Sequence, residues 1–177
     1  MNIELRPEEE NDFYAVENLT REAFWNLYRP GCYEHLLMHN LRKSEQFVKE
    51  LDFVASQGNE IIGNIAYAKA KITDNDKQHV VLTLGPLSVS PAHQKKGIGS
   101  QLINHTIGLA RKLSYKAIVI YGNPEYYKRF GFLPSRHYNI TDMDGNSPDY
   151  LMALELFPQA MKGTEGKFHE GDAYHID

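Results

Sequence analysis

Apolar residues recur near the start of the chain with the spacing of one helical face. Between residues 7 and 28 they include Phe13 and Leu27, and this periodicity predicts an amphipathic helix. Arg29-Pro30-Gly31 ends that pattern, because proline and glycine both interrupt helices. A second, shorter helix is predicted over residues 33–41.

The pattern after residue 50 favours β-strands. Two β-favouring runs, 51–56 and 60–71, flank Gln57-Gly58-Asn59, which predicts a β-hairpin. Residues 78–90 form the longest β-like run and contain Gly85-Pro86. Because proline cannot donate a ladder hydrogen bond, we expect this strand to bulge or splay there.

The second half alternates helical and strand patterns. We predict a helix over 97–113, a short buried strand over 116–121, a short helix over 124–130 and a closing strand over 150–156. The residues from 158 onward are rich in glycine and weakly patterned. This layout predicts an α/β (α+β) fold whose mixed, mostly antiparallel sheet has a right-handed crossover in the middle.

Composition narrows the function classes. The chain has 177 residues, of which 42% are hydrophobic and 24% charged, so we expect a single globular domain over residues 1–177. The net charge of −4 argues against a protein that coats nucleic acid. No apolar run is long enough for a membrane helix, and the acidic start is unlike a signal peptide. The single cysteine, Cys32, suits a reducing compartment, so we expect a cytoplasmic location.

The segment Gln94-Lys95-Lys96-Gly97-Ile98-Gly99 lies between the end of a predicted strand and the start of a predicted helix. The first amide groups of a helix have no partner within it, and its dipole favours negative charge. Glycines let an anion approach the backbone, and the two lysines add positive charge. The segment therefore predicts a phosphate site, although a Gly-x-Gly turn is weak evidence by itself.

Two motifs together resemble the GNAT superfamily of N-acetyltransferases. Leu87-Ser88-Val89-Ser90-Pro91 followed by Gln94-x-x-Gly97-x-Gly99 is similar to the acetyl-CoA signature of that superfamily. Tyr126-Tyr127-Lys128-Arg129-Phe130-Gly131-Phe132 lies about one helix and one strand later, where the superfamily commonly carries a tyrosine four residues before Gly-Phe. The strings around Pro30–His35 and Gly122–Tyr127 resemble a bacterial subgroup of predicted acetyltransferases.

The resemblance implies a GNAT-like sheet with a splayed central strand and an acetyl-CoA site. The backbone of Leu87 and Val89 would pair with the pantetheine arm, and the amides of 95–100 would hold the pyrophosphate. Asn123 would either touch the cofactor or cap the short helix that follows, and capping is the preferred reading. The implied cofactor-binding residues are Leu87, Ser88, Val89, Gln94, Lys95, Lys96, Gly97, Ile98, Gly99, Ser100 and Asn123.

Acetyl transfer from a thioester needs help for the oxyanion and for the departing thiolate. The amide of Leu87, or of a neighbour, is the oxyanion donor that the resemblance implies. A phenol suits protonation of the thiolate, since its reference pKa is about 10. Tyr127 occupies the superfamily's position, and Tyr126 would point about 100° away on the same helix. We therefore predict Tyr127 as the general acid, with an aromatic packing role as the alternative.

The general base is less well defined by the sequence. Glu34 is our candidate because its segment often borders the acceptor site in this superfamily, while His35, Glu22 and a water chain stay open. Cys32, His35 and His39 have the spacing of one helical face, but no fourth ligand is nearby and acetyl transfer needs no metal. We therefore expect no metal site.

The sequence thus predicts an acetyl-CoA-dependent N-acetyltransferase that acts on a primary amine by direct transfer in a ternary complex. A CoA-binding sensor or interaction protein that has lost turnover is the alternative. Acetyl-CoA and an unknown amine are the expected partners, without nucleic acid or membrane. The oligomeric state stays open, a homodimer included.

Overall fold

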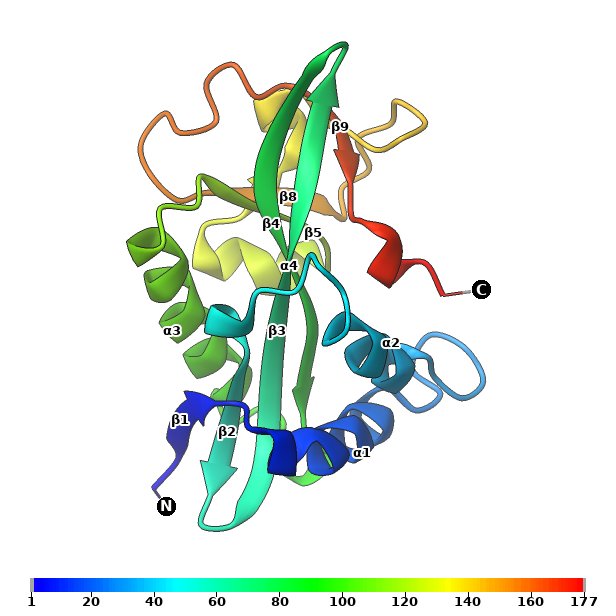
Figure 1. Cartoon of the computed structure of the whole chain (residues 1–177), viewed down its shortest axis with the longest axis vertical. Helices are drawn as coiled ribbons and strands as arrows, with labels where there is room; N and C mark the ends of the chain where they lie inside the picture. The colour runs from blue at the N-terminus through cyan, green and yellow to red at the C-terminus, as the bar shows by residue number, and fades with distance from the viewer. Residues whose placement is uncertain (1, 177) are drawn as a thin grey trace. The chain divides into compact units, whose positions relative to one another are not determined.

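The computed structural model describes residues 2–176 and has a mixed α/β fold (Figure 1). Its α-helices are α1 (Phe13–Phe24), α2 (Glu34–Leu41), α3 (Ile98–Lys112) and α4 (Pro124–Tyr127). Its strands are β1 (Glu4–Pro7), β2 (Phe53–Gln57), β3 (Glu60–Asp74), β4 (Lys77–Val89), β5 (Ala117–Tyr121), β6 (Leu133–Pro134), β7 (Ile140–Thr141), β8 (Leu151–Glu155) and β9 (Gly166–His169). Short 3-10 helices are η1 (Glu10–Asp12), η2 (Lys49–Leu51), η3 (Pro91–His93), η4 (Lys128–Phe130), η5 (Ser135–Tyr138) and η6 (Asp172–Tyr174).

The chain divides into two compact units, each assembled from separate segments. Unit 1 contains residues 2–68, 85–106 and 173–176 of the described chain, and unit 2 contains residues 69–84 and 107–172. Strands β3 and β4 and helix α3 each contribute one part to each unit. The single-domain interpretation stays a prediction.

Unit 1 is built on the order β1-β2-β3-β4. β1 and β3 both pair antiparallel with β2, and the β2–β3 register shifts between Ala55 and Ser56. Helices α1 and α2 pack on this hairpin because their apolar faces meet it (Figure 1). The shared core consists of Val16, Met38, Leu41, Val54, Ala66 and Ala68.

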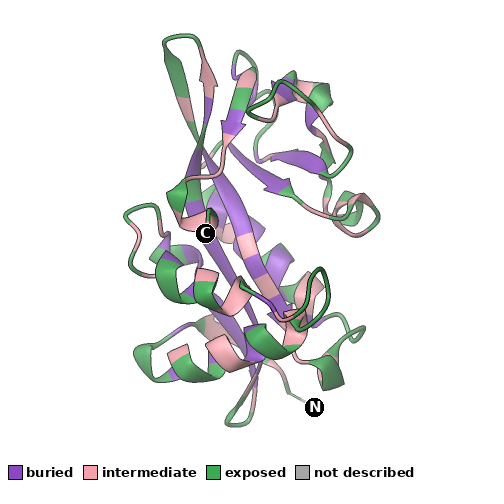
Figure 2. Cartoon of the chain, turned by 90° about the vertical axis from the view of Figure 1, so that its right-hand side faces the viewer, coloured by how far each residue is buried: buried purple, intermediate pink, exposed green. Residues whose placement is uncertain are grey.

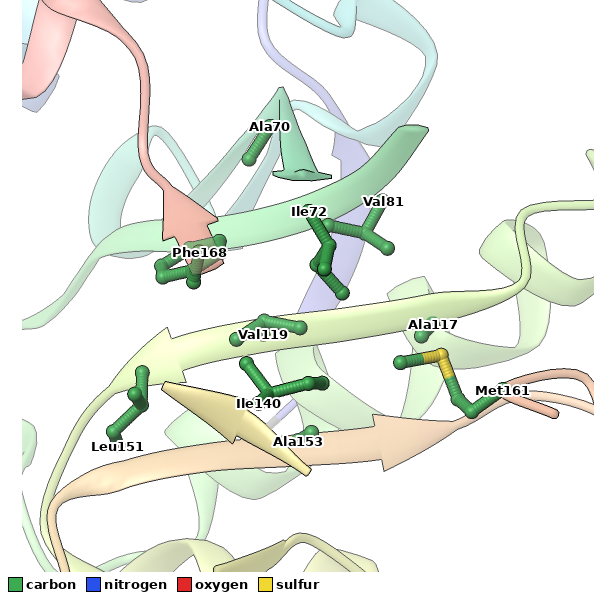
Figure 3. Packing of buried hydrophobic residues seen from close by; sticks show 10 residues of the cluster. All are labelled: Ala70, Ile72, Val81, Ala117, Val119, Ile140, Leu151, Ala153, Met161 and Phe168. Carbon is green, nitrogen blue, oxygen red and sulfur yellow. The ribbon is translucent and has the colours of Figure 1, made fainter. Parts of the chain in front are cut away.

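Unit 2 is a sheet that surrounds β5. β5 pairs antiparallel with β8 along its whole length, and its register pair with the parallel strand β4 is Leu82 opposite Ile118. β6 extends the sheet beyond β8, and β9 pairs antiparallel with the end of β3 and parallel with β7. Figure 3 shows the apolar core of this unit, in which Phe168 and Met161 join small and branched side chains.

Burial follows the predicted pattern. The middles of the long strands are buried, whereas the outer faces of α1 and α2 are exposed (Figure 2). β4 runs continuously through the Gly85–Pro86 peptide, which is cis. The strand therefore does not end at this point, and the expected bulge or splay stays a prediction.

Sequence patterning placed the main elements and missed the short ones. The mixed α/β class, the β2–β3 hairpin and the β4-α3-β5 crossover are confirmed. The first helix begins at Phe13 instead of Pro7, because residues 4–7 form strand β1 and residues 10–12 form η1. Three further strands, β6, β7 and β9, lie where the sequence predicted no regular structure.

Candidate active site

The predicted phosphate segment forms a tight turn between η3 and α3 in unit 1. Lys95 has φ +61° and Gly97 has φ +83°, so both lie in the left-handed region. The amide of Gln101 donates to the carbonyl of Gly97 at 3.0 Å, which closes the first turn of α3. The amides of the residues between them precede the first intrahelical hydrogen bond, so they are the groups that an anion would meet.

Gly97 fits an anion site because of its conformation and its surroundings. Its φ is one that L side chains rarely adopt, and a Cβ built there would meet no atom within 4 Å. The space beside its backbone is therefore open, and the turn needs glycine for its backbone angle. This geometry matches a loop that receives a phosphate or pyrophosphate through its main chain.

Side chains of the same segment mostly bind neighbouring backbone. Gln94 Nε2 donates to the Val89 carbonyl at 3.1 Å, and Lys96 Nζ donates to the Ala92 carbonyl at 2.9 Å. Lys95 is exposed. Gln94 therefore ties the loop to the end of β4, Lys96 ties it to η3, and Lys95 contributes charge at the surface.

The three residues at the end of β4 alternate in burial. Leu87 and Val89 are half-buried, whereas Ser88 is 2% exposed. Ser88 Oγ donates to Thr20 Oγ1 at 3.2 Å, and Thr20 Oγ1 in turn donates to Asn64 Oδ1 at 3.4 Å. The Ser88 side chain thus points into the core of unit 1, and only its backbone is available on the strand's other side.

This buried chain of polar groups was not anticipated from the sequence. Asn64 continues it by donating from Nδ2 to the sulfur of Met38 at 3.9 Å, and Asn64 and Thr20 are fully buried. The chain links β4, α1, β3 and α2. A buried polar residue without a hydrogen-bond partner destabilises the fold, so such residues are found in pairs or chains. Polar residues inside apolar runs were the sequence signal that could have pointed to this chain of hydrogen bonds.

Tyr127 lies in unit 2, in the last turn of α4. Its ring packs edge-on against Phe132 at 5.5 Å between centroids, and Phe132 is 1% exposed. Tyr126 packs at 5.1 Å with its ring at 89° to that of Tyr127. The Arg129 guanidinium lies 4.7 Å from the centre of the Tyr126 ring. The two phenols therefore have different environments, as their helical spacing predicts.

Asn123 caps the helix that carries Tyr127. Its Oδ1 accepts from the amide of Glu125 at 3.0 Å, and its carbonyl accepts from the amides of Tyr126 and Tyr127. Pro124 follows at the first helical position, which suits the fixed φ of proline. The preferred capping role of Asn123 is confirmed.

The segment that joins α1 to α2 closes on itself. The amide of Asn26 donates to the Gly31 carbonyl at 2.9 Å, and the amide of Gly31 donates to Asn26 Oδ1 at 2.8 Å. Three large apolar residues of this loop are more than half exposed: Trp25, Leu27 and Tyr28. Arg29 lies 4.9 Å from the centre of the Tyr33 ring.

Glu34, the candidate base, begins α2. Its Oε2 accepts from the amide of Tyr33 at 3.0 Å, and the residue is half-buried. The neighbouring Cys32 Sγ lies 3.3 Å from His35 Nδ1, and burial raises the pKa of the thiol. In this conformation the Glu34 carboxylate therefore stabilises the start of the helix.

The three residues with metal-like spacing do not converge. His39 Nδ1 contacts Glu17 Oε1 at 3.0 Å and its Nε2 contacts Lys43 Nζ at 2.8 Å, while Cys32 pairs with His35. Among residues 2–176, no group of three or more histidine, cysteine or acidic side chains is arranged to hold a metal ion.

A buried ionic cluster supports α2 in unit 1. Arg42 binds Glu8 through two hydrogen bonds of 3.0 and 2.6 Å and also contacts Glu17. Asp52, 4% exposed, is hydrogen bonded to Glu8, and its Oδ1 has no partner. Burial, followed by the hydrogen bond and charge of Glu8, raises the pKa of Asp52 to about 9. Burial beside Glu8 therefore disfavours the charged form of Asp52 in the folded protein.

Comparisons with known proteins agree with the fold. The acetyltransferase (GNAT) domain family matches residues 49–134, a range that contains β4, the loop, α3 and α4. The chain thus contains a segment that matches the acetyltransferase (GNAT) domain family. The resemblance drawn from the two motifs is thereby confirmed.

Two similar proteins match this chain over nearly its whole length. The uncharacterized N-acetyltransferase YhbS of Escherichia coli K12 is 26% identical over 161 residues, which cover 90% of this chain and 92% of YhbS. The crystal structure of E. coli YhbS in complex with CoA has a TM-score of 0.87, with 22% identity and coverage of 98% and 92%. A GNAT acetyltransferase of Brucella melitensis in complex with acetyl-CoA has a TM-score of 0.78, with 24% identity and coverage of 98% and 99%.

No helix within residues 2–176 combines the length and apolar character that a bilayer-spanning helix requires.

Proposed function

We propose that this protein transfers an acetyl group from acetyl-CoA to a primary amine of a small molecule or peptide, directly, in a ternary complex. The observation that carries the proposal is the left-handed turn at Lys95 and Gly97, which opens into α3. Two structural neighbours, YhbS and the Brucella acetyltransferase, were crystallised with CoA and acetyl-CoA. We further propose that the protein works in the cytoplasm.

The backbone of unit 1 would hold the cosubstrate. The amides of residues 95–100 bind the pyrophosphate, and the main chain of Leu87 and Val89 pairs with the pantetheine arm. The Val89 carbonyl already accepts from Gln94, but a carbonyl oxygen has a second lone pair. These proposed contacts are made by main-chain atoms, in keeping with the inward direction of the Ser88 side chain.

The chemistry would divide between an oxyanion donor and an acid. Bound acetyl-CoA supplies a thioester carbonyl for the amine to attack. The amide of Leu87, or of a neighbour, stabilises charge on the carbonyl oxygen. Tyr127 donates its phenolic proton to the departing thiolate, as its position in the superfamily motif suggests. Glu34 accepts a proton from the amine, after giving up its hydrogen bond to the Tyr33 amide.

The first test is binding, because it does not require the acceptor. Calorimetry should show that CoA binds and that pantetheine, which lacks the pyrophosphate, binds at least tenfold more weakly. Gly99→Glu places a carboxylate at the second residue of α3 and should abolish CoA binding, while circular dichroism shows a folded protein. Unchanged CoA affinity in the folded variant would exclude the loop as the phosphate site.

The second test is turnover. A library of amines and peptides is screened for release of free CoA thiol from acetyl-CoA, with Gly99→Glu as the matched control. Release that depends on one class of amine supports the enzyme. Tight CoA binding without release for any amine would favour the alternative, a CoA-binding sensor or interaction protein.

A further inference from the structure

Gly122, directly after β5, lies against the ring of Tyr127. A Cβ built on Gly122 would be 2.6 Å from Tyr127 Cε2, 2.7 Å from Tyr127 Cδ2 and 3.2 Å from Ile120 Cδ1. Side-chain carbons do not approach other heavy atoms within 3.0 Å. No left-handed φ accounts for glycine here, so the absent side chain leaves the space that the phenol ring occupies.

The backbone on both sides of this contact is fixed. The amide of Gly122 donates to the Tyr150 carbonyl at 2.8 Å. The next residue, Asn123, caps the helix that carries Tyr127. A Cβ at Gly122 therefore cannot be accommodated by a small movement of either segment alone.

Other aromatic rings also contact Tyr127. Phe132, 1% exposed, packs edge-on to Tyr127, and the rings of Tyr126 and Phe130 lie at centroid distances of 5.1 and 6.4 Å from it. A ring displaced by a Cβ at Gly122 would have to repack against these neighbours, of which Phe132 is a core residue. The contact with Gly122 therefore acts together with these aromatic neighbours to position the Tyr127 ring.

We infer that Gly122 is a positioning residue for acetyl transfer, because its bare backbone fixes the Tyr127 phenol in place. This rests on the proposed role of Tyr127 as the general acid. Gly122 itself supplies no group to the reaction. A methyl group at this position should misplace the hydroxyl without removing it, and misplacement by about 1 Å is enough to slow catalysis by about 100-fold.

The first test is structural and needs no acceptor. The ring carbons of tyrosine are labelled with ¹³C, and the Tyr127 signal is assigned by its loss in Tyr127→Phe. Gly122→Ala should shift this signal. Gly108→Ala is the matched control, because a Cβ at Gly108 meets nothing within 4 Å, and it should leave the signal in place. An unchanged Tyr127 signal in Gly122→Ala would overturn the inference whatever Tyr127 does in catalysis.

A stability cycle covers the case in which Gly122→Ala folds poorly. Gly122→Ala should lower the melting temperature of the wild type by several degrees. In a Tyr127→Ala background, which lacks the ring, Gly122→Ala should change the melting temperature very little. If Gly122→Ala alone is unfolded, the additional Tyr127→Ala substitution should restore folding. An equal loss in both backgrounds would show that Gly122 does not act through the ring.

The kinetic test separates this inference from the proposed function. With the acceptor from the screen, Gly122→Ala should lower kcat about 10- to 100-fold with a CoA affinity within twofold of the wild type. In the Tyr127→Phe background it should cause less than a twofold further loss. Full kcat in Gly122→Ala together with a damaged Tyr127→Phe would overturn the positioning role. Full kcat in Tyr127→Phe would instead overturn the proposed acid.

Discussion

The two units differ in what they bury. Every buried carboxyl group among the described residues lies in unit 1, namely Glu8, Asp12 and Asp52, whereas the buried polar residues of unit 2 are Thr83, Ser135 and Thr164. Unit 1 offers its backbone to the proposed cosubstrate and uses polar side chains internally. Unit 2 has an apolar core and presents a phenol on packed rings. One unit thus depends on main-chain conformation and buried hydrogen bonds, and the other on packing.

The largest expected effect concerns the phenol of unit 2. Tyr127→Phe keeps the ring packing against Phe132 and removes the proton donor, so kcat should fall about 10²- to 10⁴-fold with little change in CoA affinity. Tyr126→Phe is the matched control and should be much milder. A severe loss in Tyr126→Phe alone would assign the acid to the other phenol.

A backbone change should come next, in the loop of unit 1. A Cβ at Gly97 would meet no atom within 4 Å, but the branched side chain of Gly97→Val is strained at φ +83°, so the loop should relax away from its anion-binding shape. CoA affinity measured by calorimetry should fall about 10- to 100-fold, in line with the cost of such strain. Lys95→Ala, which removes an exposed charge, should cost only a few-fold and less at high salt. The reverse order would mean that charge, and not backbone shape, holds the phosphates.

The buried carboxyls should make the stability of the protein depend on pH. The pKa of Asp52 is raised to about 9, above its unfolded value of about 4, so folding takes up a proton between these values. The free energy of unfolding should therefore fall as pH rises through this window, by at most about 1.4 kcal/mol per pH unit from this group. Urea unfolding from pH 5 to 9 should show a flatter profile for Asp52→Asn. Asp149→Asn, at an exposed ion pair, should keep the wild-type slope.

The smallest expected effect distinguishes the role of the Ser88 side chain from that of its backbone. Ser88→Ala removes the donor to Thr20 and should lower the free energy of unfolding by about 1 to 2 kcal/mol. CoA affinity should stay within twofold of the wild type, because the proposed contact uses the main chain of β4. A tenfold loss of affinity at unchanged stability would show that the hydroxyl itself takes part in binding.

Local patterning was sufficient for the parts of the molecule that repeat a period. The β2–β3 hairpin and α3 follow from apolar spacing and turn residues near Gly58 and Gly97, and the cap at Asn123 follows from the proline after it. The short edge strands do not follow from local patterning. β1 and β9 have four residues each and gain their structure from pairing with β2 and β3, which no local pattern encodes.

In the candidate site, too, local sequence predicted only part of the structure. The motif identified the loop and Tyr127, but the partners of individual side chains depend on the fold. The Ser88–Thr20–Asn64 chain joins residues up to 68 positions apart, and Gly122 reads as an ordinary turn glycine until the ring beside it is placed. Long-range packing of this kind is visible only in the folded chain.

The closed loop between α1 and α2 gives the protein a built-in optical reporter. Trp25 is the single tryptophan of the chain and is 57% exposed, and a Cβ at Gly31 would lie 3.9 Å from its ring. Intrinsic emission excited at the red edge of absorption therefore comes from this loop alone. Any molecule that covers the loop should shift that emission to shorter wavelength and protect it from iodide quenching, so ligands of this region can be detected without a label.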